Sequence, residues 1–286
     1  MPACLSAVIT PTACPPSAAT ARIGVFDSGL GGLSVLRAIR SLLPAAELMY
    51  VADSGHAPYG ERGDAHVIAR SRAIAAFLRK RGADLLVIAC NTATAAAVSA
   101  LRQDHPVWPI VGVEPGIKPA AGLTRNGRIG VMATTGTLRS ERFRLLAQAH
   151  AAHVDLRLQP CPGLAAAIES GEVDSPEVRE RVAEHCAPLR EQQVDTVVLG
   201  CTHYPFVAHH IQAELGPMVR LIDTSDAVAR RTRHLCESLP ARAAWPVAAA
   251  TDAARLWTTG EQVRLESFAR RWLDFAWQAE AAAIPD

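Results

Sequence analysis

Short apolar runs rich in Val and Ile alternate along the chain with longer stretches of helical periodicity. The short runs predict β-strands and the longer stretches predict helices. Because the strand candidates are almost continuously apolar, we expect them to be buried on both faces, as in parallel sheets covered by helices. Strands are expected at 22–26, 48–52, 85–89, 110–113, 128–132, 154–158, 196–199 and 220–222, and the expected helices include 33–43, 65–81, 139–151, 175–193 and 207–215.

Two of the predicted strands occur twice. The letters Arg-Ile-Gly-Val at 22–25 recur at 128–131, and the stretch 85–92 is echoed by 196–203. The two pairs keep the same order, with nearly equal offsets of 106 and 111 positions. This repeat predicts an α/β protein: two similar α/β domains with mostly parallel sheets, related by pseudo-two-fold symmetry. We expect a flexible N-terminal extension at 1–21, a first domain at 22–113 plus 226–286, and a second domain at 114–225.

The ends of the repeated strands carry the candidate chemistry. Ligands of parallel α/β sheets bind beyond the carboxyl ends of the strands, so we expect the active site in the cleft between the two domains. Cys90 and Cys201 each follow a repeated strand and precede polar residues that open a helix. The N–H groups and positive dipole end of a helix lower the pKa of a nearby thiol. Two reactive thiols are therefore predicted, with Asp27 and His203 close enough to tune them.

Two opposed thiols suit the inversion of a carbon stereocentre. One takes a proton from one face of the carbon, and the other returns a proton to the opposite face. The developing carbanion needs fixed hydrogen-bond donors, for which the sequence offers Ser28, Asn91, Thr92 and Thr202. The other cysteines lack this setting and are expected to pack in the core or to lie in the extension: Cys4, Cys14, Cys161, Cys186 and Cys236.

Composition and charge exclude several classes of protein. Hydrophobic residues make up 49% of the 286, which excludes a disordered chain. The 29 basic and 28 acidic residues nearly cancel, so no partnership with nucleic acid is expected. No apolar run approaches the roughly 20 residues that span a bilayer, and 1–21 does not resemble a signal peptide, so we expect a cytoplasmic protein without a membrane partner. The sequence contains no CxxC pair, so it gives no indication of a metal site. Neither Lys80 nor Lys118 is well placed to bind pyridoxal phosphate.

Six short motifs stand at these strand ends and the loops beside them. They are FDSGLGGL at 26–33, YVAD at 50–53, PYGER at 58–62, ACNTA at 89–93, ATTGT at 133–137 and GCTHYP at 200–205. Taken together in this order, they resemble the signature set of the cofactor-independent glutamate racemases. The resemblance runs from about residue 22 to the C-terminal segment that contains Trp257, Phe268 and Trp272, and no motif position departs from the family pattern.

The resemblance implies an enzyme that interconverts L- and D-glutamate, uses no metal or cofactor, and supplies D-glutamate for peptidoglycan synthesis. It implies that Cys90 is the base for D-glutamate and Cys201 the base for L-glutamate, assisted by Asp27, His203 and Glu169. The implied substrate contacts are Asp27, Ser28, Tyr59, Gly60, Asn91, Thr92, Thr202 and His203, with Thr134 and Thr137 as further candidates. A homodimer is expected, and the extension is compatible with an activator of the UDP-muramoyl-alanine type.

A nucleotide-binding oxidoreductase is the main competing hypothesis from another class. Gly29 and Gly31 follow the first strand, and Asp53 lies about where a ribose-binding acid would. However, the third glycine position is Ser34, and Asp27 would place a carboxylate near the pyrophosphate.

Three more classes of protein are competing hypotheses. A thiol hydrolase built on Cys201 and His203 would leave Cys90 idle, and a non-catalytic binding protein would need neither thiol. An aspartate racemase would use both, so the choice of glutamate depends on the resemblance. Some residues also have simpler roles: Asp27 as a helix N-cap, His203 as a core histidine, Glu169 as a solvated helix end and Tyr59 as a turn residue.

Overall fold

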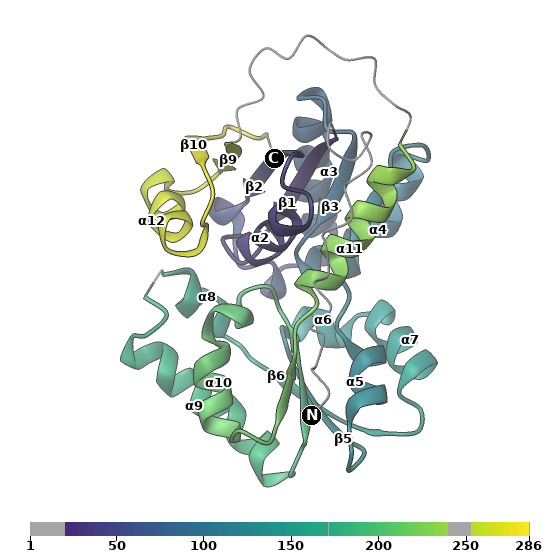
Figure 1. Ribbon diagram of the computed structural model, residues 1–286, viewed down its shortest axis with the longest axis vertical. Helices are drawn as coiled ribbons and strands as arrows, with labels where there is room; N and C mark the ends of the chain where they lie inside the picture. The colour runs from purple at the N-terminus through teal and green to yellow at the C-terminus, as the bar shows by residue number, and fades with distance from the viewer. Residues whose placement is uncertain (1–20, 171, 240–252, 286) are drawn as a thin grey trace, which may run out of the picture.

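The chain forms two α/β lobes, which lie one above the other in Figure 1. The computed structural model describes residues 21–170, 172–239 and 253–285. The expected flexible extension therefore lies outside the described residues, except for Ala21. Among the helices that are described, none has the length and apolar character needed to cross a bilayer.

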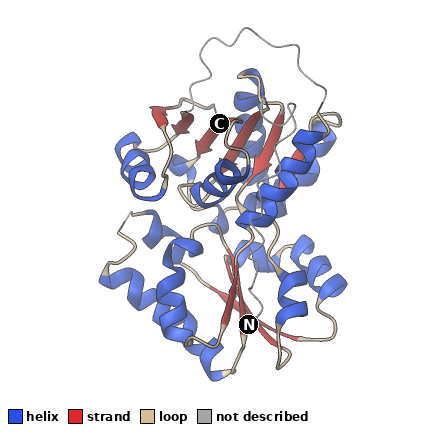
Figure 2. Cartoon of the chain, viewed as in Figure 1, coloured by secondary structure: helices blue, strands red, loops and turns tan. Residues whose placement is uncertain are grey.

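The first lobe contains a six-stranded parallel sheet flanked by helices (Figure 2). The strand order is β10-β9-β2-β1-β3-β4, and every pairing is parallel. Its strands are β1 (Arg22–Asp27), β2 (Glu47–Ala52), β3 (Leu85–Ile88), β4 (Ile110–Gly112), β9 (Ala254–Thr258) and β10 (Trp277–Ala281). Its helices are α2 (Leu33–Leu42), α3 (Asp64–Lys80), α4 (Asn91–Asp104), α11 (Ser225–Glu237) and α12 (Gln262–Trp272), with short 3₁₀ turns η1 (Ser54–His56) and η2 (Tyr59–Glu61).

The second lobe contains a four-stranded parallel sheet in the order β6-β5-β7-β8. Its strands are β5 (Arg128–Ala133), β6 (Asp155–Pro160), β7 (Thr196–Gly200) and β8 (Arg220–Ile222). Its helices are α5 (Ile117–Leu123), α6 (Thr135–Arg139), α7 (Glu141–His150), α8 (Leu164–Glu169), α9 (Pro176–Glu191) and α10 (Ala208–Leu215), and a 3₁₀ turn η3 (Tyr204–Val207) precedes α10.

The two sheets repeat the same arrangement of strands. The order β2-β1-β3-β4 in the first lobe corresponds to β6-β5-β7-β8 in the second. The register also corresponds, because Ile23 pairs with Leu85 in the first sheet and Ile129 pairs with Thr196 in the second. These observations confirm the predicted fold of two similar, mostly parallel α/β units. The division of the chain into domains after residues 113 and 225 stays a prediction.

Helix α12 connects the two lobes through an aromatic cluster. Phe206 of η3 packs edge-on against Phe268, with ring centroids 4.9 Å apart, and lies 4.7 Å from the ring of Trp272. Phe206 follows the strand-end segment of the second lobe, whereas α12 follows β9 of the first sheet. The aromatic cluster therefore fixes the Cys201 loop against the first lobe.

A buried ion pair holds the end of β2 in place. Asp53 is fully buried and accepts hydrogen bonds from Arg70 Nε at 3.0 Å and Nη2 at 2.9 Å. Tyr59 and Thr259 also donate to this carboxylate, at 2.5 and 2.8 Å. Although burial raises the pKa of Asp53, these hydrogen bonds lower it below its usual value. Arg70 in turn donates to the Pro285 carbonyl at 2.7 Å, so the Asp53–Arg70 pair connects β2, α3, η2 and the C-terminal segment.

The Arg70→Ala variant is expected to be strongly destabilised. It leaves a buried carboxylate without its cation, which costs about 3–5 kcal/mol of unfolding free energy. Arg72→Ala is the matched control, because Arg72 lies on the same helix but pairs with Asp104 at the surface. Urea unfolding of both variants should show a large loss for Arg70→Ala and little change for Arg72→Ala. Equal losses in the two variants would contradict a structural role for the buried pair.

Candidate active site

A cavity of about 240 Å³ lies between the two lobes at the carboxyl ends of their strands. Both repeated cysteines line this one cavity, Cys90 from the first lobe and Cys201 from the second. The first lobe also contributes Ser28, Tyr59, Gly60, Asn91 and Thr92, and the second contributes Thr134, Glu169, Thr202 and His203. The structure therefore brings together residues that are more than 100 positions apart in the sequence.

The Cys90 side chain caps the N-terminus of α4. Its sulfur accepts a hydrogen bond from the Ala93 N–H at 3.3 Å and lies 3.5 Å from Ser28 Oγ. Burial raises the pKa of Cys90 to about 12, and the negative charge of Asp27 adds to this rise. The hydrogen bonds from Ala93 and to Ser28 act in the opposite direction but are outweighed. The helix end therefore lowers the pKa of Cys90 as expected, but burial outweighs it and the net shift is upward.

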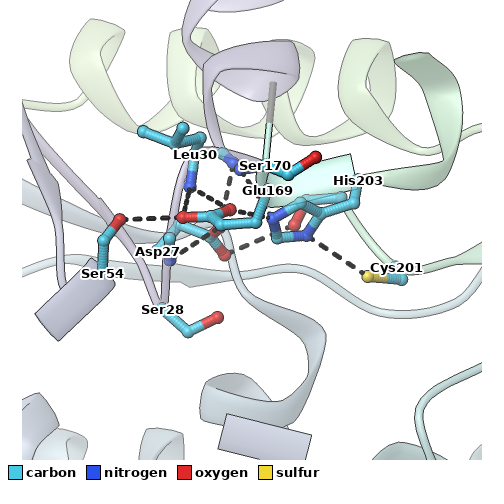
Figure 3. Close-up of polar contacts among 12 residues, drawn as sticks. Asp27, Ser28, Leu30, Ser54, Glu169, Ser170, Cys201 and His203 are labelled. Carbon is cyan, nitrogen blue, oxygen red and sulfur yellow. Dashed lines mark hydrogen bonds and ion pairs between the residues drawn. The ribbon is translucent and has the colours of Figure 1, made fainter. Parts of the chain in front are cut away.

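Cys201 has a different partner, a histidine backed by a carboxylate (Figure 3). The Cys201 sulfur lies 3.6 Å from Nδ1 of His203, and Nε2 of the same ring lies 2.5 Å from Oε2 of Glu169. Burial lowers the pKa of His203, but its hydrogen bonds to Cys201 and Glu169 raise it well above its ordinary value. An imidazolium in this position donates to the sulfur on one side and to the carboxylate on the other.

Glu169 is held as an anion by four hydrogen-bonding contacts. The Leu30 N–H approaches both carboxylate oxygens, at 3.0 and 2.9 Å, and Ser54 donates at 2.8 Å. Burial raises the pKa of Glu169, but the hydrogen bond and charge of His203, together with the bonds from Leu30 and Ser54, lower it below its usual value. The Gly31 N–H also lies 3.2 Å from Nε2 of His203. Glu169 is much closer to Nε2, so we infer that Nε2 carries a proton and donates it in a hydrogen bond to the Glu169 carboxylate. Glu169 is thus a partly buried partner of His203, and its description as a solvated helix end is wrong.

Side chains of the second lobe pack closely against the glycine-rich loop at 28–32. A Cβ atom added at Gly29 would lie 2.4 Å from Oε1 of Glu169, and one added at Gly31 would lie 2.4 Å from Nδ1 of His203. These glycines therefore permit the two lobes to approach closely. Glu169 takes the backbone N–H that a dinucleotide phosphate would need, and Asp53 is bound to Arg70. A nucleotide-binding oxidoreductase is not compatible with this arrangement.

Asp27 lies outside the lining of the cavity and is fully buried. Its carboxylate accepts hydrogen bonds from the N–H groups of Gly29 and Gly32, at 3.3 and 3.0 Å, and from Thr202 Oγ1 at 3.3 Å. The N-cap of α2 is Gly32, so Asp27 is not the helix cap itself. Burial raises the pKa of Asp27, the charge of His203 lowers it, and the net shift is upward. Asp27 orders the glycine-rich loop and acts on Cys90 through its charge.

The remaining predicted contacts lie around the cavity and differ in whether their polar groups already have hydrogen-bond partners. Asn91 lines the cavity, and its Oδ1 is buried without a hydrogen-bond partner within the described part of the chain. Thr92 and Thr134 join the two lobes through their hydroxyls, which are 2.9 Å apart. The Tyr59 hydroxyl donates its hydrogen bond to Asp53, so it is not a free donor for a ligand. Gly60 packs so closely on Thr134 that an added Cβ would lie 2.9 Å from its Cβ.

Three residues that support the site are not among those predicted from the sequence. Ser54 donates to Glu169, Tyr50 donates to the Gly29 carbonyl at 2.6 Å, and Arg70 neutralises Asp53. Ser54 directly follows the strand end at Asp53, so its position was a usable signal. Tyr50 and Arg70 lie within regular elements, where a periodic pattern predicts packing or exposure but not a polar partner.

The Glu169–His203 pair predicts a stability contribution that changes with pH. A raised histidine pKa stabilises the fold fully below its ordinary value of 6.5, and this contribution is lost as the pH rises through the folded value. A lowered glutamate pKa stabilises the fold above its ordinary value of 4.5, and this contribution is lost as the pH falls through the folded value. The pair is therefore most stabilising between about pH 4.5 and pH 6.5.

Glu169→Gln is expected to lower the unfolding free energy by about 1.5–3 kcal/mol near pH 5.5, with a smaller loss near pH 9. Urea titrations at both pH values measure the difference. Glu177→Gln, at an exposed position on α9, is the control and should show little loss at either pH. A loss for Glu169→Gln that does not change between the two pH values would contradict the charged pair.

Comparison with known proteins identifies the family. The family model for Asp/Glu/Hydantoin racemase matches residues 23–232. A glutamate racemase of Pseudomonas syringae pv. tomato is 52% identical over 215 residues, which are 75% of this chain and 78% of that protein. A glutamate racemase of Pseudomonas aeruginosa is 49% identical over 250 residues, 86% of this chain and 92% of that protein.

A solved structure agrees with these relatives. The crystal structure of Escherichia coli glutamate racemase in complex with L-glutamate and the activator UDP-MurNAc-ala has a TM-score of 0.83 and 32% identity, and the match covers 93% of this chain and all of that one. The chain belongs to the Asp/Glu/hydantoin racemase family and is an isomerase, an amino-acid racemase. These three relatives are glutamate racemases, which confirms the activity expected from the six motifs.

Proposed function

We propose that this protein interconverts L- and D-glutamate by moving protons between the substrate and two thiols, without a cofactor. The observation that carries this proposal is the placement of Cys90 and Cys201 in one cavity, each from an equivalent strand end of its lobe. A thiol hydrolase does not explain this second thiol, because Cys201 already has His203 beside it. The glutamate racemases among the relatives support glutamate as the substrate.

Each direction of the reaction uses both sulfurs. Starting from L-glutamate, the Cys201 thiolate takes the proton from the α-carbon, and the Cys90 thiol gives a proton to the opposite face. The product is D-glutamate, with Cys201 now protonated and Cys90 now a thiolate. Starting from D-glutamate, the roles are reversed. Loss of one S–H bond is balanced by formation of the other, so no external acid or base is consumed within one turnover.

The neighbours of each sulfur suit this exchange of roles. The His203 imidazolium stabilises the Cys201 thiolate, and Glu169 keeps that imidazole protonated. Burial raises the pKa of Cys90, which favours its protonated thiol. We propose that the substrate ammonium group brings a positive charge beside Cys90 and lowers its pKa, so that the thiolate forms only when substrate is bound. Asp27 assists through its charge on Cys90 and its hydrogen bond from Thr202.

The substrate is proposed to lie across the cavity between hydrogen-bonding groups of both lobes. Asn91 Oδ1 is a free acceptor for the ammonium group. Ser28, Thr92, Thr202 and backbone groups at the cavity wall are donors for the carboxylates, where negative charge develops during proton removal. Tyr59, Gly60 and His203 complete the proposed contacts, with Thr134 beside Thr92.

We further propose the biological setting that the family implies. The enzyme supplies D-glutamate for peptidoglycan from the cytoplasm and works as a homodimer. The relative from Escherichia coli was solved with UDP-MurNAc-ala as its activator, which supports testing a compound of this type on the present enzyme.

A circular-dichroism assay of the purified full-length protein tests the proposal. L-Glutamate and D-glutamate should each lose their optical signal and reach the same racemic end point, with and without chelator. L-Aspartate serves as the competing substrate, and a UDP-linked muramoyl-alanine is added in a parallel series. Faster racemisation of aspartate than of glutamate would contradict the assigned substrate, and no racemisation of either, with activator present, would contradict the function.

A further inference from the structure

A second cluster of reactive side chains lies outside the cavity. Asp174, in the segment between α8 and α9, faces two consecutive histidines at the start of α10, His209 and His210. One ligand atom from each of the three residues lies within 4.8 Å of the other two. None of the three lines the cavity that holds the thiols. We propose that Asp174, His209 and His210 form a binding site for a divalent transition-metal ion of the zinc class.

The spacing of the three ligand atoms supports this proposal. Nε2 of His209 lies 3.1 Å from Oδ1 of Asp174, and Nε2 of His210 lies 3.0 Å from the same oxygen. Zinc binds imidazole nitrogen and carboxylate oxygen at about 2.0–2.2 Å in a tetrahedron, whose edges are about 3.3–3.6 Å. Small side-chain rotations would therefore admit an ion between the three atoms.

The chemistry and exposure of the cluster also suit such an ion. Two imidazoles and one carboxylate favour zinc, cobalt or nickel over magnesium and calcium, which prefer oxygen ligands. The side chains of His209 and Asp174 are 56% and 46% exposed, which leaves space for a water ligand, while His210 is 14% exposed and fixed in place.

Arg271 of α12 orients the carboxylate without using its ligand oxygen. Its Nη2 lies 2.6 Å from Oδ2 of Asp174, whereas both histidines contact Oδ1. A carboxylate can hold a cation on each oxygen, so the arginine and the metal ion are compatible. An ion bound here would join the segment that follows Glu169 to the helix that follows His203, because Asp174 is five residues beyond the first and His209 six beyond the second.

Titration of the untagged, chelator-treated full-length protein with Co²⁺ tests the site. Visible absorption reports binding, and the near-ultraviolet thiolate band distinguishes ligation by cysteine. We expect one Co²⁺ per chain without a thiolate band, a dissociation constant at least tenfold higher in His209→Ala and in Asp174→Asn, and a rise in Tm on binding that His209→Ala lacks. His153→Ala, an exposed histidine elsewhere, is the control and should bind as the wild type does.

One further variant helps to decide between the ion site and a purely structural cluster. Arg271→Gln removes the ion pair but keeps all three ligands, so it should bind Co²⁺ at least as tightly as the wild type. Loss of Co²⁺ binding in this variant, unchanged binding in His209→Ala, a thiolate band, or no binding by the wild type would each overturn the proposal. Circular dichroism of each variant without metal verifies that it is folded. Racemase activity of the chelator-treated protein is measured separately. Neither thiol belongs to the ion site, so a failure of metal binding and a failure of the proposed function can be distinguished.

Discussion

Replacing either Cys90 or Cys201 by alanine is expected to lower glutamate racemisation by about 10³-fold or more. Each thiol is the one acid and base available on its face of the substrate, and a positioned acid–base group contributes about 10²–10⁴-fold. Because one turnover needs both groups in sequence, the two single variants and the double variant should be similarly inactive. Circular dichroism with each enantiomer measures the loss.

The matched control is Cys186→Ala on α9. Cys186 is also a fully buried thiol, but it lies in the core and not in the cavity. Its replacement should reduce stability and leave kcat close to that of the wild type. Substantial racemisation by either active-site variant, with a native unfolding curve, would contradict two-thiol catalysis.

The His203→Asn variant is expected to reduce kcat/KM by about 10²-fold. Asparagine keeps a polar group in the same place but removes the imidazolium that faces the Cys201 sulfur. Enantiomers have equal free energies, so the equilibrium constant is one and kcat/KM must fall by the same factor in both directions. Rates of racemisation alone therefore cannot show which thiol has been affected.

Exchange of the α-proton with deuterated water separates the two halves of the reaction. In His203→Asn, Cys90 is intact and should still remove and return the α-proton of D-glutamate, so deuterium enters recovered D-glutamate faster than L-glutamate forms. Exchange into L-glutamate, which depends on Cys201, should be slow. A variant that loses both exchanges equally would indicate a general structural role for His203 in place of a role at Cys201.

The central strands are predictable because their sequences are almost continuously apolar. The strands β1, β3, β5 and β7 are buried between helices, and the repeat between the lobes identifies their equivalence. By contrast, the apolar pattern does not predict β9 and β10. Strand β10 is a sheet edge with the sequence WQAEA, which is mostly exposed and has no apolar run. Its position depends on pairing with β9, a tertiary contact that short-range patterning does not report.

Helix boundaries differ from the prediction where a side chain competes with the backbone. The periodicity predicts a single helix over 139–151, but α6 ends at Arg139 and α7 begins at Glu141. Ser140 separates them, because its hydroxyl accepts a hydrogen bond from the Phe143 N–H at 3.1 Å and caps α7. Helical periodicity continues across this position, so the apolar pattern alone does not reveal the break.

The sequence predicts which residues form the candidate site, but it does not predict their pKa values. The motifs and the repeat identify both thiols, and Glu169 is expected only from the resemblance, since its partner Leu30 is 139 positions away. The raised pKa of Cys90 is not foreseeable, because the benefit of a helix N-terminus is local whereas burial arises from the whole fold. The Asp174–His209–His210 cluster also arises from the tertiary fold, because the histidines lie 35 and 36 positions beyond the aspartate. Local sequence therefore does not predict it.

The central claim is that two different sulfur atoms handle the two faces of one α-carbon, and isotope incorporation tests it most directly. The wild-type enzyme is incubated with protiated L-glutamate in deuterated water, and the first few per cent of product is analysed by mass spectrometry. Cys201 removes protium and Cys90 delivers a solvent-derived deuteron, so the early D-glutamate should carry one deuterium at the α-carbon while the remaining L-glutamate stays unlabelled. Early D-glutamate that retains protium, or label found only in recovered L-glutamate, would contradict the account.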